Sequence, residues 1–227
     1  MEISLTCRLV LARCRNLAFA LALLAPTMSS AQYLGPTPYT SFASSPFSSV
    51  SFNYFHLETF EDGLLNTPGV TASAGYPVWF GSDSVNGGVY TYYSGPTNII
   101  QFAFNAAALG GQLPTHVGFV WADVGVASPT YGYGNVLIEA YDGSYAPLGV
   151  HGSFAVGDGS NAFGTAEDRF LGVVNLSGIT SLFIIMPDST DWELDHLQYG
   201  YAAVPEPKAF GLLALGFGLL LGKRSVR

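Results

Sequence analysis

Short apolar or alternating runs recur between residues 53 and 199, and Gly, Asn, Asp or Pro bounds each of them. No window of a dozen residues shows the i, i+3, i+4 apolar stripe of an amphipathic helix, and residues 106–108 form at most one helical turn. Runs of this length between turn residues are typical of strands. We expect strands near 53–60, 76–81, 89–93, 99–105, 116–123, 135–142, 148–156, 169–174, 181–186 and 192–199.

The spacing of these strands favours an all-β domain built as a two-sheet antiparallel sandwich, with a β-barrel as the alternative. The 27 glycines of the chain supply turn residues, and Tyr, Phe and Val are abundant. We expect this domain over residues 53–203. Residues 32–52 are rich in Ser, Pro and Thr without a helical or strand period, which predicts an extended arm.

Residues 1–31 have the order of a secretory signal peptide: basic residues, an apolar run, then small residues. We expect a signal helix that directs export, with cleavage by signal peptidase between Ala31 and Gln32. A buried N-terminal helix is the alternative. Both cysteines, Cys7 and Cys14, lie in this segment, so the mature protein has no thiol chemistry and no disulfide.

The C-terminal residues 204–227 form a distinct tail in three parts. Two prolines end the last strand near residue 203, because proline cannot continue a sheet ladder. The apolar stretch 209–222 follows, and as a helix it would measure roughly 20 Å, which is short of a bilayer core of about 30 Å. We therefore expect a short transmembrane segment that needs bilayer thinning or snorkelling. The terminal basic residues are expected on the cytoplasmic side: Lys223, Arg224 and Arg227.

The motif Val204-Pro205-Glu206-Pro207, followed by the apolar segment and the basic terminus, resembles the PEP-CTERM sorting signal of Gram-negative bacteria. The resemblance implies processing by an exosortase-type membrane protease in organisms that make exopolysaccharide. It predicts a protein that is transiently held in the membrane and then reaches the cell surface or the extracellular matrix. The apolar segment is shorter than the usual pattern, and an ordinary tail anchor is the alternative.

Three further segments resemble the jelly-roll-like sandwich domains that are common in PEP-CTERM proteins. They are residues 60–63 (FEDG), 167–173 (EDRFLGV) and 193–200 (ELDHLQYG). The resemblance implies a structural Ca²⁺ between the first and last strands, held by carboxylate oxygens. Glu61, Asp62 and Asp195 are the expected ligands, with Glu58 and Glu193 in reserve. The alternative is that these acids are solvated and discourage edge pairing.

Charge restricts the partners of the domain. From residue 32 to residue 203 there are fourteen acidic residues against one basic residue, Arg169, a formal charge of −13. Such a surface repels phosphate backbones, which excludes nucleic acid as a partner. It is compatible with divalent cations, with neutral glycans, or with solubility outside the cell.

Aromatic residues beside Gly-rich turns are candidates for a glycan platform, because rings stack on sugar faces. The candidates are Trp79, Tyr92, Tyr93, Tyr131 and Tyr133. Trp121 lies in an apolar run and is expected in the core. The alternative is that the Tyr-rich strands simply pack.

Paired carboxylates suggest one enzymatic alternative. Asp191, Glu193 and Asp195 alternate, so on a strand they share one face with successive side chains about 6.5 to 7 Å apart, close to the spacing in inverting glycosidases. No second feature indicates a substrate cleft. The four histidines are isolated, which argues against zinc, and the nucleophile-elbow, P-loop and dinucleotide motifs are absent from the sequence.

The sequence therefore predicts a non-enzymatic exported protein, sorted to the cell surface or the exopolysaccharide matrix. A carbohydrate-binding module that contacts extracellular polysaccharide is the alternative, and a secreted glycoside hydrolase is the weaker one. No cofactor is expected apart from the structural Ca²⁺.

Overall fold

A computed structural model describes residues 30–79, 84–124, 135–156 and 167–202. Within these ranges the chain is all-β, with twelve strands in two antiparallel sheets and three short 3₁₀ turns. No helix in this part of the chain is long and apolar enough to span a membrane. The predicted signal helix and the predicted tail segment 209–222 lie outside the described residues.

The larger sheet contains seven strands in the order β1-β10-β7-β12-β5-β4, and β2 also pairs with β12. The eleven-residue β12 is its centre: its first residues pair with β5, its later residues pair with β2, and its other edge pairs with β7. The strands are β1 Gln32–Pro38, β2 Phe52–Glu58, β4 Tyr76–Trp79, β5 Tyr90–Tyr93, β7 His116–Val124, β10 Arg169–Val174 and β12 Trp192–Ala202.

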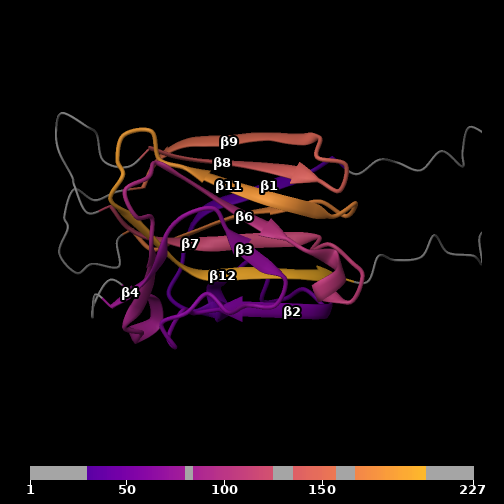
Figure 1. Cartoon of the computed structure of the whole chain (residues 1–227), viewed down its shortest axis with the longest axis horizontal. Helices are drawn as coiled ribbons and strands as arrows, with labels where there is room; N and C mark the ends of the chain where they lie inside the picture. Colours follow the sequence, from indigo (N-terminus) through magenta and orange to yellow (C-terminus); the bar gives the residue numbers. More distant parts are fainter. Residues whose placement is uncertain (1–29, 80–83, 125–134, 157–166, 203–227) are drawn as a thin grey trace, which may run out of the picture. The chain divides into compact units, whose positions relative to one another are not determined.

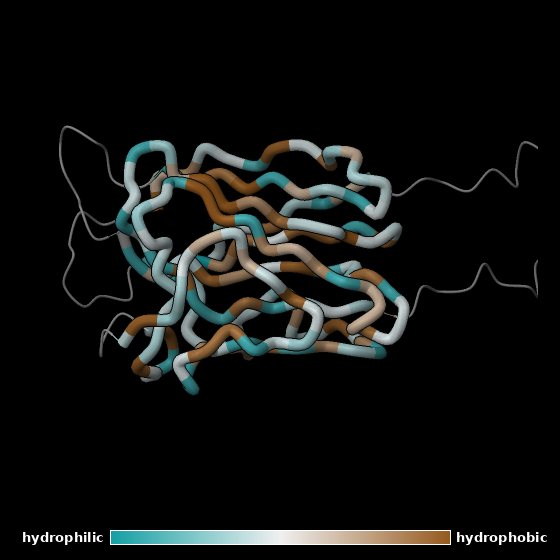
Figure 2. The backbone as a smooth tube through the Cα atoms, in the orientation of Figure 1, coloured by the Kyte–Doolittle hydropathy of each residue, from teal (hydrophilic) through white to brown (hydrophobic). Residues whose placement is uncertain are grey.

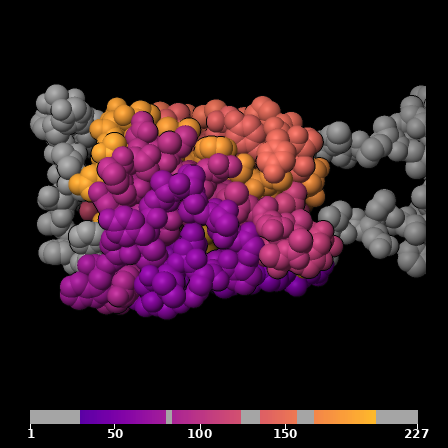
Figure 3. Space-filling model, in the orientation of Figure 1, coloured from indigo at the N-terminus to yellow at the C-terminus, as the bar shows by residue number. Residues whose placement is uncertain are grey.

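The smaller sheet contains five strands in the order β3-β6-β11-β8-β9. Figure 1 shows β8 and β9 at the upper edge of the view and β2 at the lower edge. In Figure 3 the indigo-to-purple part of the chain covers the lower half of the near face, below the salmon surface of β8 and β9. The strands are β3 Val70–Ala72, β6 Ile99–Phe104, β8 Asn135–Asp142, β9 Pro147–Ala155 and β11 Ile179–Ile185.

The main core lies between the two sheets. Hydrophobic and hydrophilic residues alternate along many strands (Figure 2), so that one side of each sheet is apolar. Trp121 of β7 and Trp192 of β12 are fully buried and stack with ring centroids 5.5 Å apart. Phe102 of β6 and Leu182 of β11 meet them from the smaller sheet in the same cluster of buried residues. The predicted core position of Trp121 is confirmed.

A second, smaller core covers the outer face of the larger sheet. Phe170 of β10 and Val120 of β7 point outward, and Tyr39 and Phe47 of the segment after β1 bury them. Val85, in the 3₁₀ turn Val85–Gly87, completes this cluster. The predicted extended arm is therefore not a free arm: it contributes a strand and then docks on the sheet.

The strand predictions agree closely with the structure, and the exceptions have physical causes. β8 and β10 have the predicted bounds, and the predicted turn at residues 106–108 is a 3₁₀ turn, Ala106–Leu109. β1 was not expected, because Gly35, Pro36 and Pro38 hide its strand pattern. β3 has three residues, too few to show a period. β12 extends to Ala202, past the expected limit of 199, because Gly200 and Tyr201 still pair with β2.

The register of the larger sheet defines two ends, which we call the tail end and the loop end. Gln32 and Ala202, the outermost described strand residues of the chain, lie at the tail end, where one ladder row joins Gln32, Val174, His116 and Gly200. At the loop end a second row joins Pro38, Arg169, Trp121 and Leu194. Both directions of the chain thus leave the sheet from the same end.

Candidate functional site

Two tyrosines meet at the outer side of the larger sheet, at the loop end. Tyr76 of β4 and Tyr93 of β5 are cross-strand partners, with ring centroids 5.7 Å apart and ring planes at 82°. Tyr76 is 54% exposed although it is a large aromatic residue. A ring this exposed beside a second ring offers an apolar surface to a ligand.

Carboxylates lie next to this pair of rings. Glu193 of β12 is the cross-strand partner of Tyr93, and its Oε2 accepts a 2.5 Å hydrogen bond from the hydroxyl of Thr91. Asp191 precedes β12 and hydrogen-bonds the Tyr93 hydroxyl. Burial, and then the charge of Asp191, raise the pKa of Tyr93. We name these five residues the aromatic–acid face: Tyr76, Thr91, Tyr93, Asp191 and Glu193.

The predicted glycan platform is thus divided by the structure. Trp79 is 66% exposed, but it lies three residues after Tyr76 on β4 and points to the opposite side of the sheet. The prediction that Tyr92 is exposed is wrong. Side chains alternate along β5, so Tyr92 faces the core and is 2% exposed. Its hydroxyl donates a hydrogen bond to the Ala74 carbonyl at 2.9 Å. Burial raises the pKa of Tyr92 to about 12. Tyr131 and Tyr133 lie outside the described residues.

The buried carboxylate of Asp195 is the centre of a second polar region, on the same outer face. It is fully buried, and it accepts hydrogen bonds from the backbone N–H of Val85 at 2.9 Å and of His196 at 2.6 Å. Burial raises the pKa of Asp195 well above its usual value; the two N–H groups oppose this effect, and the charges of Glu61 and Asp168 add to it.

Two of the three expected calcium ligands lie near each other. Glu61 acts electrostatically on Asp195, and its carboxylate accepts the backbone N–H groups of Val89 and Tyr90 at 3.0 to 3.1 Å. The carboxylate of Asp62 is engaged elsewhere: it accepts hydrogen bonds from the backbone N–H of Leu64 and from the side-chain amide of Asn66. The reserve ligands are also engaged: Glu58 with Phe60 and Thr67, and Glu193 with Thr91.

A buried hydroxyl lies beside Glu61. Ser84 is 9% exposed, and its Oγ has no hydrogen-bond partner among the described residues. A Cβ at Gly88 would collide with both the Glu61 carboxylate and Ser84 Oγ, so these two groups converge over Gly88. Among the described residues, no three histidine or acidic side chains gather closely enough to hold a metal ion. Calcium binding therefore stays a prediction.

The three acids of the enzymatic alternative are not equally accessible. Glu193 shares the outer face of β12 with Asp195, as the alternation predicts, and Asp191 lies just before the strand. Asp195, however, is covered by the Val85 turn. A carboxylate that is enclosed in this way cannot face Glu193 across a substrate.

A polar network holds the segment after β1 against β12. The Tyr39 hydroxyl lies 2.7 Å from Nδ1 of His196 and accepts from Nε2 of Gln198 at 3.3 Å. The Ser45 hydroxyl donates to Oε1 of Gln198 at 2.6 Å. These buried groups satisfy one another, which fixes the segment in one position. Sequence reasoning missed Tyr39, Ser45 and Tyr76; the neighbouring Gly75 is the signal that could have identified Tyr76.

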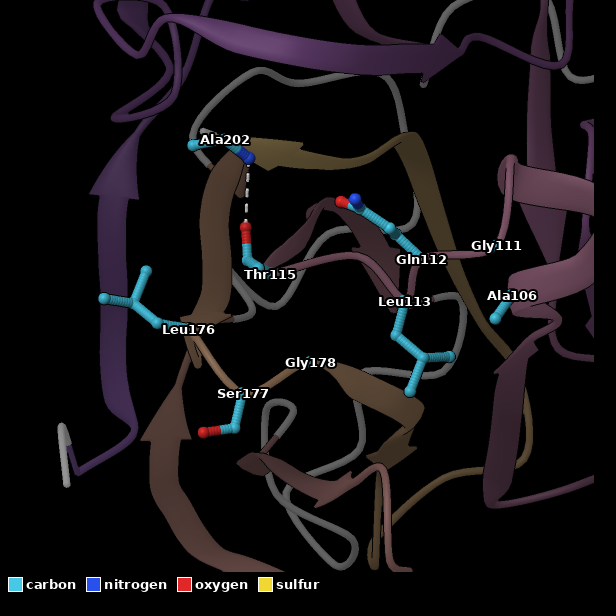
Figure 4. A pocket seen from close by; sticks show the side chains of 9 residues that line it. All are labelled: Ala106, Gly111, Gln112, Leu113, Thr115, Leu176, Ser177, Gly178 and Ala202. Atoms are coloured by element: carbon cyan, nitrogen blue, oxygen red, sulfur yellow. Dashed lines mark hydrogen bonds between the residues drawn. The ribbon is translucent and has the colours of Figure 1, made fainter. Parts of the chain in front are cut away.

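A shallow pocket of about 360 Å³ lies at the tail end (Figure 4). The loop before β7, the turn between β10 and β11, and the end of β12 line it. Thr115 Oγ1 accepts the backbone N–H of Ala202 at 3.2 Å and closes one wall. All nine lining residues are uncharged: Ala106, Gly111, Gln112, Leu113, Thr115, Leu176, Ser177, Gly178 and Ala202.

Comparisons with known proteins give two structural likenesses. No family model and no curated protein matches the chain. The C-terminal family 22 carbohydrate binding module of Clostridium thermocellum Xyn10B is 14% identical with a TM-score of 0.40, over 68% of this chain and 97% of that one. A xylan-binding domain of the same carbohydrate-binding family is 13% identical with a TM-score of 0.37, over 69% and 98%. At this level of similarity, the function is argued from the residues of the site itself.

Proposed function

We propose that this chain is an exported surface protein whose β domain binds a neutral glycan without cleaving it. The observation that carries the proposal is the aromatic–acid face. Its exposed Tyr76 ring stands at 82° to the Tyr93 ring, and the partly exposed carboxylate of Asp191 lies beside them. Glu193 and Thr91 of the same face are buried and bond each other. Rings contact the apolar faces of sugars, while carboxylates accept hydrogen bonds from sugar hydroxyls.

The charge of the domain supports a neutral ligand over an acidic one. The formal charge of −13 over residues 32–203 repels uronic-acid or phosphate polymers, and the acids Asp191 and Glu193 lie within the face itself. A neutral polysaccharide meets no such repulsion. Its hydroxyls can replace the water that now solvates the exposed part of the face.

A pull-down with neutral and acidic polysaccharides tests this proposal. The mature protein should be retained by at least one neutral glucan, mannan or xylan and by no acidic polymer. Replacing Tyr76 with Ala should abolish retention. Tyr145→Ala, a change of an even more exposed tyrosine at the tail end, is the matched control and should be retained like the wild type. Failure of every neutral polymer to retain the protein would contradict the proposal.

The location at the cell surface is also a proposal, and it rests on the sequence patterns at the two ends of the chain. Residues 1–31 direct export, the tail 204–227 holds the protein in the membrane, and an exosortase-type protease acts around Pro205–Pro207. A variant with Pro205→Ala, Glu206→Ala and Pro207→Ala should stay in the membrane fraction at its unprocessed mass. Processing equal to that of the wild type would exclude the sorting role of the motif.

We also retain a structural Ca²⁺ beside Glu61 and Asp195 in a jelly-roll-like domain. The unpartnered Ser84 hydroxyl supports it, because Ca²⁺ takes hydroxyl and carboxylate oxygens as ligands. The ion would offset the repulsion that the charges of Glu61 and Asp168 exert on the Asp195 carboxylate.

A further inference from the structure

The tail end of the domain presents exposed apolar side chains. Tyr145, in the turn between β8 and β9, is 73% exposed, and Leu176, in the turn between β10 and β11, is 40% exposed. Leu113 lies between these two turns: its Cδ1 is 3.3 Å from the position that a Cβ would take at Gly143, in the first turn, and at Gly178, in the second. We name Leu113, Tyr145 and Leu176, together with the uncharged pocket that Figure 4 shows, the tail-end surface.

Acidic residues are concentrated away from this surface. Seven described acids lie at the loop end. Glu139 lies in the middle of β8, Glu58 ends β2 opposite Leu197 in the middle of β12, and Glu61 and Asp62 follow β2. Among the described residues, Asp142 alone lies at the tail end, where its carboxylate accepts from Ser144 and from the backbone N–H of Ala146. The seven at the loop end are Asp123, Glu167, Asp168, Asp188, Asp191, Glu193 and Asp195.

The chain leaves the sheet at this same end. Ala202 ends β12 beside the pocket, and six residues separate it from the apolar segment 209–222. Even fully extended, six residues span no more than about 20 Å. An apolar segment that is embedded in a bilayer therefore keeps the tail-end surface close to that bilayer. Gln32, which follows the predicted signal, lies at the same end.

We propose that the tail-end surface rests on the lipid surface while the tail is embedded. This inference depends on the proposed membrane tail. Tyr145 suits the headgroup region, because its ring is apolar and its hydroxyl polar, and Leu176 adds apolar area at the same level. Anionic lipid repels acidic groups, so the acid-poor end faces the membrane and the acid-rich loop end faces away. The aromatic–acid face then points toward the extracellular matrix.

Site-directed fluorescence in vesicles tests this orientation. The mature domain contains no cysteine, so with Cys7→Ser and Cys14→Ser the full chain accepts single probes. We would attach an environment-sensitive fluorophore at Tyr145→Cys or Leu176→Cys, and at Val150→Cys as the control. Val150 is 59% exposed on β9, between the two ends. The vesicles contain phosphatidylcholine and phosphatidylglycerol, with a nitroxide quencher on a fraction of the headgroups.

Quenching at residues 145 and 176 should exceed that at residue 150 by at least about twofold, since the quencher acts only at the lipid surface. Adding Leu176→Asp to the Tyr145→Cys chain should reduce this quenching, whereas adding Val150→Asp should not. Equal quenching at all three probes would overturn the inference. A probe at Leu213→Cys tests the membrane tail separately. If it is quenched while the probes at 145 and 176 are not, the tail is embedded and only the proposed orientation of the domain is wrong. If it is not quenched, both the membrane tail and the orientation are excluded.

Discussion

The hydroxyl of Tyr39 lies 2.7 Å from Nδ1 of His196, although the two residues are 157 positions apart in the sequence. The contact joins the segment after β1 to the central strand of the larger sheet. His196 has a φ of 46°, and the register of β12 against β7 shifts between Asp195 and Gln198. This irregularity places His196 beside Tyr39 on the covered outer face.

Replacing Tyr39 with Phe should destabilise the domain by about 1 to 3 kcal/mol, because it leaves the buried groups of His196 and Gln198 without their partner. Tyr145→Phe removes a hydroxyl from an exposed ring and should change the free energy of unfolding by less than about 0.5 kcal/mol. Urea denaturation at neutral pH measures both. Equal stabilities of the two variants would contradict the role of the Tyr39 contact.

Stability should fall as the pH drops from about 6.5 to about 4. Burial lowers the pKa of His196 to about 4 from an ordinary 6.5, so the unfolded chain takes up a proton in this window and the folded chain does not. At about 1.4 kcal/mol per pH unit, the loss reaches about 3 kcal/mol. Asp195 acts in the opposite direction, because its raised pKa makes the folded state bind a proton first.

The comparison with His196→Asn isolates this contribution, since asparagine tolerates a positive φ and does not titrate. Burial also lowers the pKa of His116, but His116 and Asp195 are present in both proteins, so their contributions to the pH dependence cancel in the difference. Urea denaturation at several pH values should show that the wild type loses stability more steeply than the variant between pH 6.5 and 4. Parallel curves would mean that His196 does not titrate in the way its burial predicts.

Most of the strands could be predicted because their residues carry the signal locally. β8 alternates half-buried and buried residues from Asn135 to Tyr141. β1 could not be predicted, because its residues include two prolines and it forms a strand only through its pairing with β10. Position in the sheet also determines which way the two neighbouring tyrosines of β5 point: Tyr92 faces the core and Tyr93 faces the outer side.

The candidate site was predicted only in part, for a similar reason. Tyr93 and Trp79 were identified from their neighbouring glycines, but the partner of Tyr93 is Tyr76, which lies on another strand. Asp195 was identified as a candidate calcium ligand, yet its burial depends on the Val85 turn, 110 residues away in the sequence. Contacts between such distant segments leave no local pattern.

Calcium should raise the thermal stability of the mature protein. A ligand that binds the folded state at a hundredfold excess over its Kd adds about 2.7 kcal/mol, which should move Tm by several degrees relative to EDTA. Gly88→Ala places a methyl group against Glu61 and Ser84 and should remove the shift. Asp62→Asn should keep it, since Asp62 is turned toward Leu64 and Asn66. Identical Tm values in Ca²⁺ and EDTA would exclude the ion.

The protein should release no reducing ends from the polysaccharide that it binds. Asp195 is fully buried and Glu193 is only 7% exposed, so these two carboxylates cannot flank a sugar on β12. A reducing-sugar assay should give the same background for the wild type and for a variant with Asp191→Asn and Glu193→Gln. Hydrolysis by the wild type that this double variant loses would establish the enzymatic alternative.

The most direct test of the account is the dissociation constant for the neutral polysaccharide that retains the protein, measured by affinity electrophoresis for the wild type and three variants. Tyr76→Ala and Asp191→Asn should each weaken binding by about tenfold or more, the equivalent of about 1.4 kcal/mol. Tyr145→Ala should bind like the wild type. Binding that is unchanged by Tyr76→Ala and Asp191→Asn would contradict the assignment of the aromatic–acid face as the glycan site.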